Sequence, residues 1–247
     1  MASFTHRDLR LIEPAYRSPI TDLIIELDHL RKKIPVGTTK PWIFFQLKEI
    51  FHLMECIGSA RIEGNNTTLA EYIETKFEPR PSSQPHIVEI GNMEAAMSFI
   101  DANAGSAINR AFISELHKSV VRHLPPPPGG EGDKTPGNYR EHAVTIARSK
   151  HVPPATRHQI EEYMNELVSF INKKDSPKYD LLKTALVHHR FMWIHPFGNG
   201  NGRMGRLLTY AMLVQQGFAV SAGHIVNPTA VFCIDRNDYY DHLAKAD

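Results

Sequence analysis

The sequence has few cysteines, no long apolar run and no excess of charge of either sign. Its two cysteines, Cys56 and Cys233, form neither a CxxC pair nor a disulfide framework, which suits a reducing compartment. The start lacks a secretory signal, and no apolar run reaches the length of about 18 residues that a membrane span needs. With 28 Lys and Arg against 27 Asp and Glu, the net charge of +1 gives no long-range attraction for nucleic acid or acidic membranes. We therefore expect a cytoplasmic protein with no membrane or nucleic-acid partner.

Strand signals are also scarce. Helical periodicity dominates, and the one convincing β-type alternation lies between Tyr139 and His151, around Val144, Thr145 and Ile146. The sequence therefore predicts an all-α fold with a small β-hairpin.

The helical patterns fall into two regions, an N-terminal one over residues 1–100 and a core over residues 101–247. In the first, Pro41 opens an apolar stretch that runs to Gly64, and these two residues suit the start and the end of a helix. We expect one long, well-buried helix over about residues 41–64. The chain ends inside a helical pattern, so we expect it to belong to a longer protein.

Capping signals and a long loop punctuate both regions. Thr68 with Glu71 and Thr156 with Gln159 have the spacing of capping boxes and predict the starts of two further helices. Residues 125–138 are rich in proline and glycine, cannot pack as helix or strand, and predict an exposed loop of the kind that is often functional.

The segment from His195 to Arg206 joins two apolar helices and carries the chemistry. Glycine occupies every second position at its centre: Gly198, Gly200 and Gly202. Without Cβ atoms, the N–H groups of such a turn can converge on an anion, and the next helix adds its positive N-terminus. Arg203 and Arg206 share one face of the first helical turn, where a pair of phosphates would suit them. His195, largely neutral at pH 7, is a candidate general base.

Two other kinds of site fit this segment less well. His188, His189 and His195 have no acidic or cysteine partner at the spacing of a known metal site. Gly200, Gly202 and Gly205 formally satisfy GxGxxG, but residues 182–194 before them have a helical pattern, and no acidic residue follows about 20 positions on. A metal centre and a dinucleotide site are therefore disfavoured.

The segment resembles the signature of Fic domain proteins, His-Pro-Phe-x-(Asp/Glu)-Gly-Asn-Gly-Arg-x-x-Arg. Residues 136–154 are similar to the family's flap hairpin, and residues 235–243 to the segment that encloses the nucleotide base, so the resemblance runs from about residue 41 to the end. It implies an α-helical Fic core that binds ATP, transfers AMP to a hydroxyl side chain of a target protein, and releases pyrophosphate.

The resemblance also implies a role for each matching residue. His195 would activate the target hydroxyl, Arg203 would contact the β-phosphate and Arg206 the γ-phosphate. Phe197 would anchor the loop in the core. The other residues of the phosphate cradle would be Gly198, Gly200, Asn201 and Gly202. The base would be enclosed by Tyr239 and Tyr240. The flap residues, which would clamp the target backbone as an added edge strand, are Val144, Thr145 and Ile146.

One position departs from the family pattern. Asn199 stands where the family has Asp or Glu, the carboxylate that binds the Mg2+ bridging the phosphates. A neutral amide oxygen is a weaker ligand for a hard cation and does not offset phosphate charge. We expect Asn199 to bind Mg2+ weakly.

A second motif lies upstream. Residues 59–65, Ser-Ala-Arg-Ile-Glu-Gly-Asn, resemble the inhibitory motif (Ser/Thr)-x-x-x-Glu-(Gly/Asn) of Fic proteins with an N-terminal inhibitory helix. Ser59 and Glu63 are four residues apart and share a helix face. The resemblance implies that Glu63 pairs with Arg206 and blocks productive placement of the γ-phosphate.

Three functions remain open at this point. The first is an auto-inhibited AMP transferase acting on Ser, Thr or Tyr of a protein, including itself. The second is a Fic relative that transfers another phosphate-containing group. The third is a nucleotide-binding module with little transfer activity, which the amide of Asn199 favours.

Overall fold

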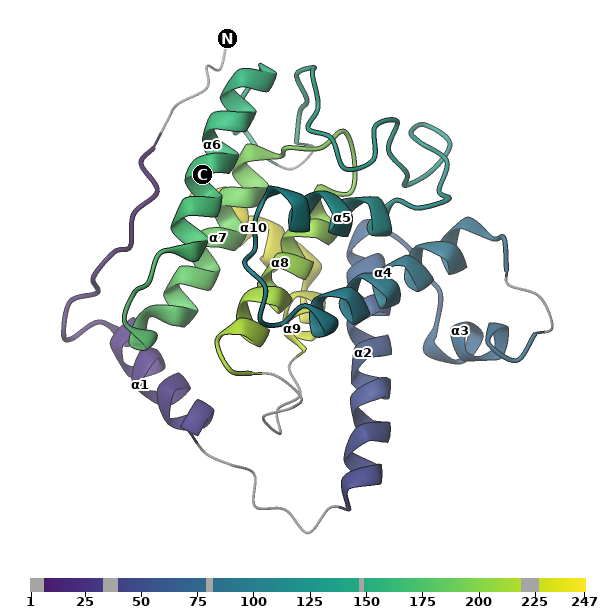
Figure 1. Ribbon diagram of the computed structural model, residues 1–247, viewed down its shortest axis with the longest axis horizontal. Coiled ribbons are helices and arrows are strands. Elements are labelled where there is room, and N and C mark those ends of the chain that lie inside the picture. Colours follow the sequence, from purple (N-terminus) through teal and green to yellow (C-terminus); the bar gives the residue numbers. More distant parts are fainter. Residues whose placement is uncertain (1–6, 33–39, 79–81, 147–148, 219–226) are drawn as a thin grey trace.

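The computed structural model describes residues 7–32, 40–78, 82–146, 149–218 and 227–247 (Figure 1). Their helices are α1 (Pro19–Lys32), α2 (Pro41–Glu63), α3 (Leu69–Thr75), α4 (Pro85–Ala102), α5 (Arg110–Val120), α6 (Arg157–Asn172), the 3-10 helix η1 (Pro177–Tyr179), α7 (Asp180–Ile194), α8 (Asn201–Gln215), α9 (Pro228–Ile234) and α10 (Arg236–Ala246).

Local signals set several of the helix bounds. The predicted capping boxes are both formed, by Thr68 and Glu71 at the start of α3 and by Thr156 and Gln159 at the start of α6. α2 ends as predicted at Gly64, whose φ of 107° is open to glycine and costly for residues with a Cβ.

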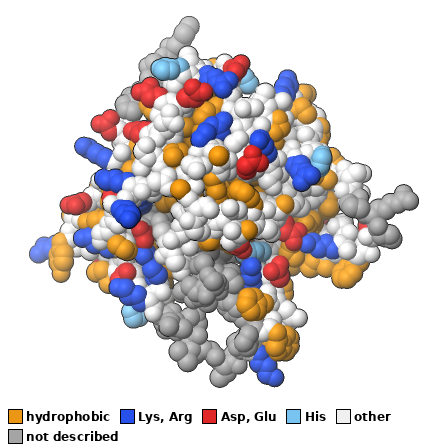
Figure 2. Space-filling view, in the orientation of Figure 1, with side chains coloured by type: hydrophobic (Ala, Val, Ile, Leu, Met, Phe, Trp, Pro, Cys, Tyr) orange, Lys and Arg blue, Asp and Glu red, His pale blue; other side chains and the backbone are white. Residues whose placement is uncertain are grey.

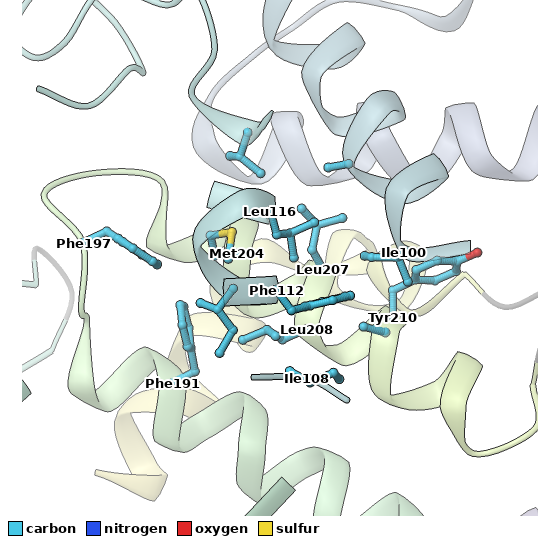
Figure 3. Close-up of a cluster of buried hydrophobic side chains, with 14 of the residues drawn as sticks. Ile100, Ile108, Phe112, Leu116, Phe191, Phe197, Met204, Leu207, Leu208 and Tyr210 are labelled. Atoms are coloured by element: carbon cyan, nitrogen blue, oxygen red, sulfur yellow. The ribbon is translucent and has the colours of Figure 1, made fainter. Parts of the chain in front are cut away.

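The core is built around α8, which packs most extensively against α7 and also meets α2, α4, α5 and α9 (Figure 1). Nearly all side chains of α8 are buried. Figure 3 shows Leu207 and Leu208 of α8 between Phe112 of α5, Ile100 of α4 and Phe191 of α7. This cluster continues across residue 100, so the two predicted regions share one hydrophobic core, and their division stays a prediction.

The predicted β-hairpin is wrong for the described part of residues 139–151, which contains no strand. The segment is held instead by one side chain, because the Arg140 guanidinium donates to four backbone carbonyls, those of His142, Pro154, Ile194 and His195, at 2.6–3.3 Å. An isolated two-stranded ribbon is marginal in water, and no third strand among the described residues supports one here.

The predicted burial of α2 is wrong for its first half. Trp42, Phe45, Ile50 and Met54 are between 43% and 58% exposed, and Figure 2 shows hydrophobic side chains at the lower end of α2. The first buried side chain among the described ones of α2 is His52, and most of those from Glu55 onward are buried. Apolar periodicity identified the helix, but it does not show how much of the helix is covered by neighbouring elements.

Candidate active site

The signature loop connects α7 to α8 through two left-handed residues. His195 follows the end of α7 with φ 52°, and Gly200 takes φ 78° just before α8 begins. Asn201 closes the loop, because its side-chain amide accepts a hydrogen bond from the N–H of Phe197 and donates one to the carbonyl of Phe197, both at 2.9 Å. Asn201 therefore holds the earlier part of the loop, at Phe197, in place.

His117 of α5 also packs against this loop. The ring of His117 stacks on Phe197, with centroids 3.7 Å apart and 4° between planes. Its Nδ1 accepts from the N–H of Gly137 at 2.8 Å, so its Nε2 carries the proton donated to the carbonyl of Asn199 at 3.0 Å. Burial lowers the pKa of His117 to about 4, which keeps this neutral tautomer at pH 7.

His195 is set up as a neutral base. Its Nδ1 lies 3.3 Å from the carbonyl of Met192, and because a carbonyl only accepts, Nδ1 carries the proton and Nε2 keeps its lone pair. Burial lowers the pKa of His195 to about 4. The imidazole is therefore unprotonated at neutral pH and can accept a proton.

A cavity of about 300 Å³ opens beside this loop. Its lining comes from α2, residues 131–146, the end of α7, the signature loop and α10: Glu63, Glu131, Thr145, Ile146, Met192, His195, Asn199, Gly200, Asn201, Gly202, Arg203, Arg236 and Tyr240. The walls combine a neutral base, glycine backbone and two arginines, which suits a phosphate ester.

Arg206 lies behind this cavity and is held by α2. Its Nε donates to the Ser59 hydroxyl at 2.8 Å, and its Nη2 donates to Glu63 Oε1 at 2.6 Å and to the Ser59 carbonyl at 3.1 Å. Burial by itself would raise the pKa of Glu63, but the charge and hydrogen bond of Arg206 lower it. Burial would likewise lower the pKa of Arg206, yet Glu63 raises it. Both side chains are charged at neutral pH.

The Glu63 carboxylate also covers the N-terminus of α8. A Cβ placed on Gly202 would lie 2.1 Å from Glu63 Oε1 and 3.2 Å from Arg206 Nη1. That Nη1 is buried and has no hydrogen-bond partner among the described residues. The carboxylate thus occupies a position that an anion would take, between a helix N-terminus and an arginine.

Arg203 is buried, with its side chain 1% exposed, and two glutamates face it. Its Nη1 lies 3.2 Å from Glu89 of α4, and its Nη2 donates to the backbone carbonyl of Glu131 at 2.6 Å. Asn65, just after α2, donates to Glu89 at 2.9 Å. The Nε of Arg203 has no hydrogen-bond partner among the described residues, which leaves a buried donor facing the phosphate site.

The side-chain oxygen at position 199 is already engaged by the backbone. The side-chain oxygen of Asn199 accepts from the N–H of Gly200 at 2.8 Å, and its NH2 group donates to the Gly132 carbonyl at 3.2 Å and to Glu131 Oε2 at 3.3 Å. No group of three or more His, Cys, Asp or Glu in the described part of the chain is placed to hold a metal ion. Asn199 alone therefore does not fit the family's metal position.

The predicted base-binding segment lies on α10. Tyr240 and Arg236 line the cavity, whereas Tyr239 is buried behind it with its hydroxyl 3.0 Å from His188 Nε2. Burial lowers the pKa of His188 to about 4, so this histidine is a neutral core residue. It contacts protein groups on both ring nitrogens, including Thr209 at 2.8 Å.

The structure brings most predicted site residues to one cavity but not all. Five lie outside its lining: Ser59 and Arg206, which are bonded to each other, Val144, Gly198, which faces Asp133, and Tyr239. The sequence analysis missed Glu89, Glu131 and His117, which reach the site from three other parts of the chain. Only Glu131 had a local signal, as an acidic residue in a glycine-rich loop.

Comparison with known proteins gives a family match. The family described as Fic/DOC matches residues 107–213, a range that includes the whole signature loop. Two curated relatives are both described as protein adenylyltransferase Fic. That from Aedes aegypti is 31% identical over 204 residues, covering 80% of this chain and 37% of the relative. That from Nematostella vectensis is 31% identical over 235 residues, covering 91% of this chain and 50% of the relative. The chain thus spans half or less of the length of these relatives.

Two solved structures have a similar fold. A Fic family protein from Desulfovibrio desulfuricans has a TM-score of 0.74 at 23% identity, covering 98% of this chain and 69% of that chain. A Fic domain containing signaling protein from Bacteroides thetaiotaomicron has a TM-score of 0.66 at 20% identity, covering 92% and 81%. Their helical arrangement is the one described above. Among the described residues, no helix combines the length and the apolarity that a bilayer crossing requires.

Proposed function

Because the chain carries a Fic/DOC-family domain over residues 107–213, we propose that it is an auto-inhibited protein adenylyltransferase. It would transfer AMP from ATP to a Ser, Thr or Tyr hydroxyl of a protein, including its own chain. The names of the curated relatives support the reaction, and the neutral base beside an arginine-rich cavity supports transfer over binding alone.

In the proposed reaction the target hydroxyl oxygen attacks the α-phosphorus of ATP. The hydroxyl proton passes to Nε2 of His195, the bond between the α-phosphorus and the bridging oxygen breaks, and pyrophosphate leaves. Arg203 and the amides of Gly200 and Gly202 would hold phosphate oxygens, and Arg206 would take the γ-phosphate. Asn201 acts through the loop that it closes.

Residues 144–146 would orient the target. Thr145 and Ile146 line the cavity, and their backbone lies in no sheet of the described residues. Backbone outside a sheet can receive an extended target segment, a mode that fixes position without reading sequence.

Mg2+ bound with ATP would supply neutralisation of the phosphate charge. The protein's own contribution is the pair of arginines and the N-terminus of α8. We assign the metal only a weak contact to Asn199, whose oxygen is turned to the Gly200 N–H.

Inhibition would come from α2, which defines the subclass with an N-terminal inhibitory helix. The single observation that carries this proposal is the Glu63–Arg206 ion pair at 2.6 Å above Gly202. While it persists, Arg206 has no room for a γ-phosphate.

The two cysteines, Cys56 and Cys233, are both unpaired, in keeping with work in the cytoplasm.

The test is labelling with ATP that carries the label on the α-phosphate in one reaction and on the γ-phosphate in another. Retention of the α-label alone on protein is the expected result. Retention of the γ-label would indicate transfer of a different phosphate-containing group. ATP binding with neither label retained, also after Glu63→Gly, would indicate a nucleotide-binding module.

A further inference from the structure

We propose that Glu131 supplies the carboxylate for the cation that accompanies ATP, in place of an acid at position 199. This inference rests on the proposed function, since it concerns the same phosphate site. The acidic ligand that the family signature has at position 199 would then come from the loop of residues 125–138.

The side chain of Glu131 lies where such a ligand is needed. It lines the 300 Å³ cavity together with Asn199 and Arg203. Its Oε2 is 3.3 Å from Asn199 Nδ2 and 3.4 Å from Arg203 Nη2. The other carboxylate in the lining, Glu63, is committed to Arg206. Because the Glu131 side chain is 48% exposed, a hydrated cation can reach it.

The loop that carries Glu131 is bonded to the signature loop by its backbone. The Glu131 carbonyl accepts from Arg203 at 2.6 Å, the Gly132 carbonyl from the Asn199 amide at 3.2 Å, and the Asp133 carboxylate from the Asn199 N–H at 3.0 Å. A Cβ on Gly132 would lie 2.0 Å from the Leu124 carbonyl, so only glycine allows this path. Position 131 is therefore held over the cavity whatever its side chain does.

The same contacts explain why position 199 is an amide. An aspartate there would place a carboxylate against the Gly132 carbonyl and the Glu131 carboxylate, where Asn199 now donates two hydrogen bonds. The amide of Asn199 can donate to the carboxylate of Glu131, whereas an aspartate at position 199 could not. Arg203 and Arg206 also keep buried donors with no hydrogen-bond partner among the described residues, which suits phosphate oxygens. A magnesium ion usually takes one or two carboxylates together with substrate phosphates, which this arrangement can provide.

The experiment measures ATP binding by titration calorimetry in the Glu63→Gly background, with Mg2+ present and with the metal chelated. The variants are Glu131→Gln, Asn199→Asp and the two together. The control is Glu115→Gln, which removes an exposed glutamate of α5 that pairs with Lys118. Electron paramagnetic resonance of Mn2+ with ATP gives a second readout that does not depend on turnover.

We expect Glu131→Gln to reduce the tightening of ATP binding by Mg2+ by about tenfold and to release Mn2+, while Glu115→Gln does neither. Adding Asn199→Asp to Glu131→Gln should restore the metal effect. An unchanged metal effect in Glu131→Gln would overturn the inference. The inference would also be overturned if the only change in Glu131→Gln were tighter ATP binding without metal. That result would mean that Glu131 obstructs the access of ATP to Arg203. If ATP binds none of the variants, the proposed function fails as well.

Discussion

Glu63 and Arg206 form an ion pair of 2.6 Å across 143 positions of sequence, and Glu63 lies directly over the first turn of α8. The pair joins the last turn of α2 to the helix that follows the signature loop. An element far upstream thus holds a buried arginine of the candidate site.

Replacing Glu63 by glycine should raise transfer activity by at least about tenfold. The substitution releases a charge-assisted hydrogen bond of Arg206, worth about 1.5–3 kcal/mol, for use by the γ-phosphate. The measurement is auto-modification with α-labelled ATP. Glu49→Gly is the control, because it places the same substitution in the exposed part of α2. Equal labelling by Glu63→Gly and the parent would contradict inhibition by Glu63.

In the Glu63→Gly background, His195→Ala should lower the transfer rate by at least about 100-fold and leave ATP affinity within about twofold, since a base acts mainly in the transition state. Arg203→Ala should weaken both, because its contact is also made before reaction. Transfer is followed with α-labelled ATP and affinity by calorimetry. His158→Ala, on the exposed face of α6, is the control. Parental turnover in His195→Ala would exclude it as the base.

In the same background, adding Asn199→Asp to Glu131→Gln should lower the Mg2+ concentration for half-maximal transfer by about tenfold relative to Glu131→Gln alone and raise the maximal rate. A carboxylate adds charge toward the cation, and neutralising the departing pyrophosphate is the step that depends on it. A Mg2+ titration of AMP labelling measures both quantities. A titration no better than that of Glu131→Gln alone would mean that an acid at position 199 cannot take over the metal contact.

Lowering the pH should reduce the free energy of unfolding already at pH values above those at which carboxylates usually titrate. Burial lowers the pKa of His117, His188 and His195 to about 4, from 6.5 in the unfolded chain. Between about pH 7.5 and 5.5 the unfolded chain therefore binds protons that the folded chain does not, and each histidine costs about 1 kcal/mol of unfolding free energy. Urea unfolding followed by circular dichroism at both pH values tests this.

Glu55 should act in the opposite direction. Burial raises its pKa to about 7, so the folded chain gains a proton there as the pH falls, which partly compensates for the histidines. Its carboxyl accepts from the Thr229 N–H at 2.9 Å and joins α2 to α9. Glu55→Gln keeps an acceptor but removes the titration, so acidification should destabilise this variant more steeply than the parent. Equal losses in both would refute the assignment.

Sequence reasoning succeeded where the signal is local. Proline at a helix start, glycine after a helix end and the capping boxes at Thr68 and Thr156 depend on neighbouring residues only, and the structure has them where predicted. The hairpin failed because Val144 and Ile146 have strand propensity but no partner strand among the described residues. Strand formation needs such a partner, and alternation cannot supply it.

The candidate site divides in the same way. The signature loop was recognisable because its residues are contiguous. Glu89, His117 and Glu131 were missed because each reaches the loop through tertiary packing, from 68 to 114 positions away from Arg203 or Asn199. Spacing rules along one helix or one turn say nothing about such pairs.

Arg140 fastens the segment that would face the target, and its side chain does so through backbone carbonyls alone. Every residue type has a carbonyl, so mutations at positions 143–146 leave that fastening intact. Lysine could not replace Arg140, because a single ammonium cannot reach four acceptors spread around a planar fork. If these residues contact a target as proposed, single substitutions at 143–146 can change which proteins are recognised without disturbing the segment's anchor.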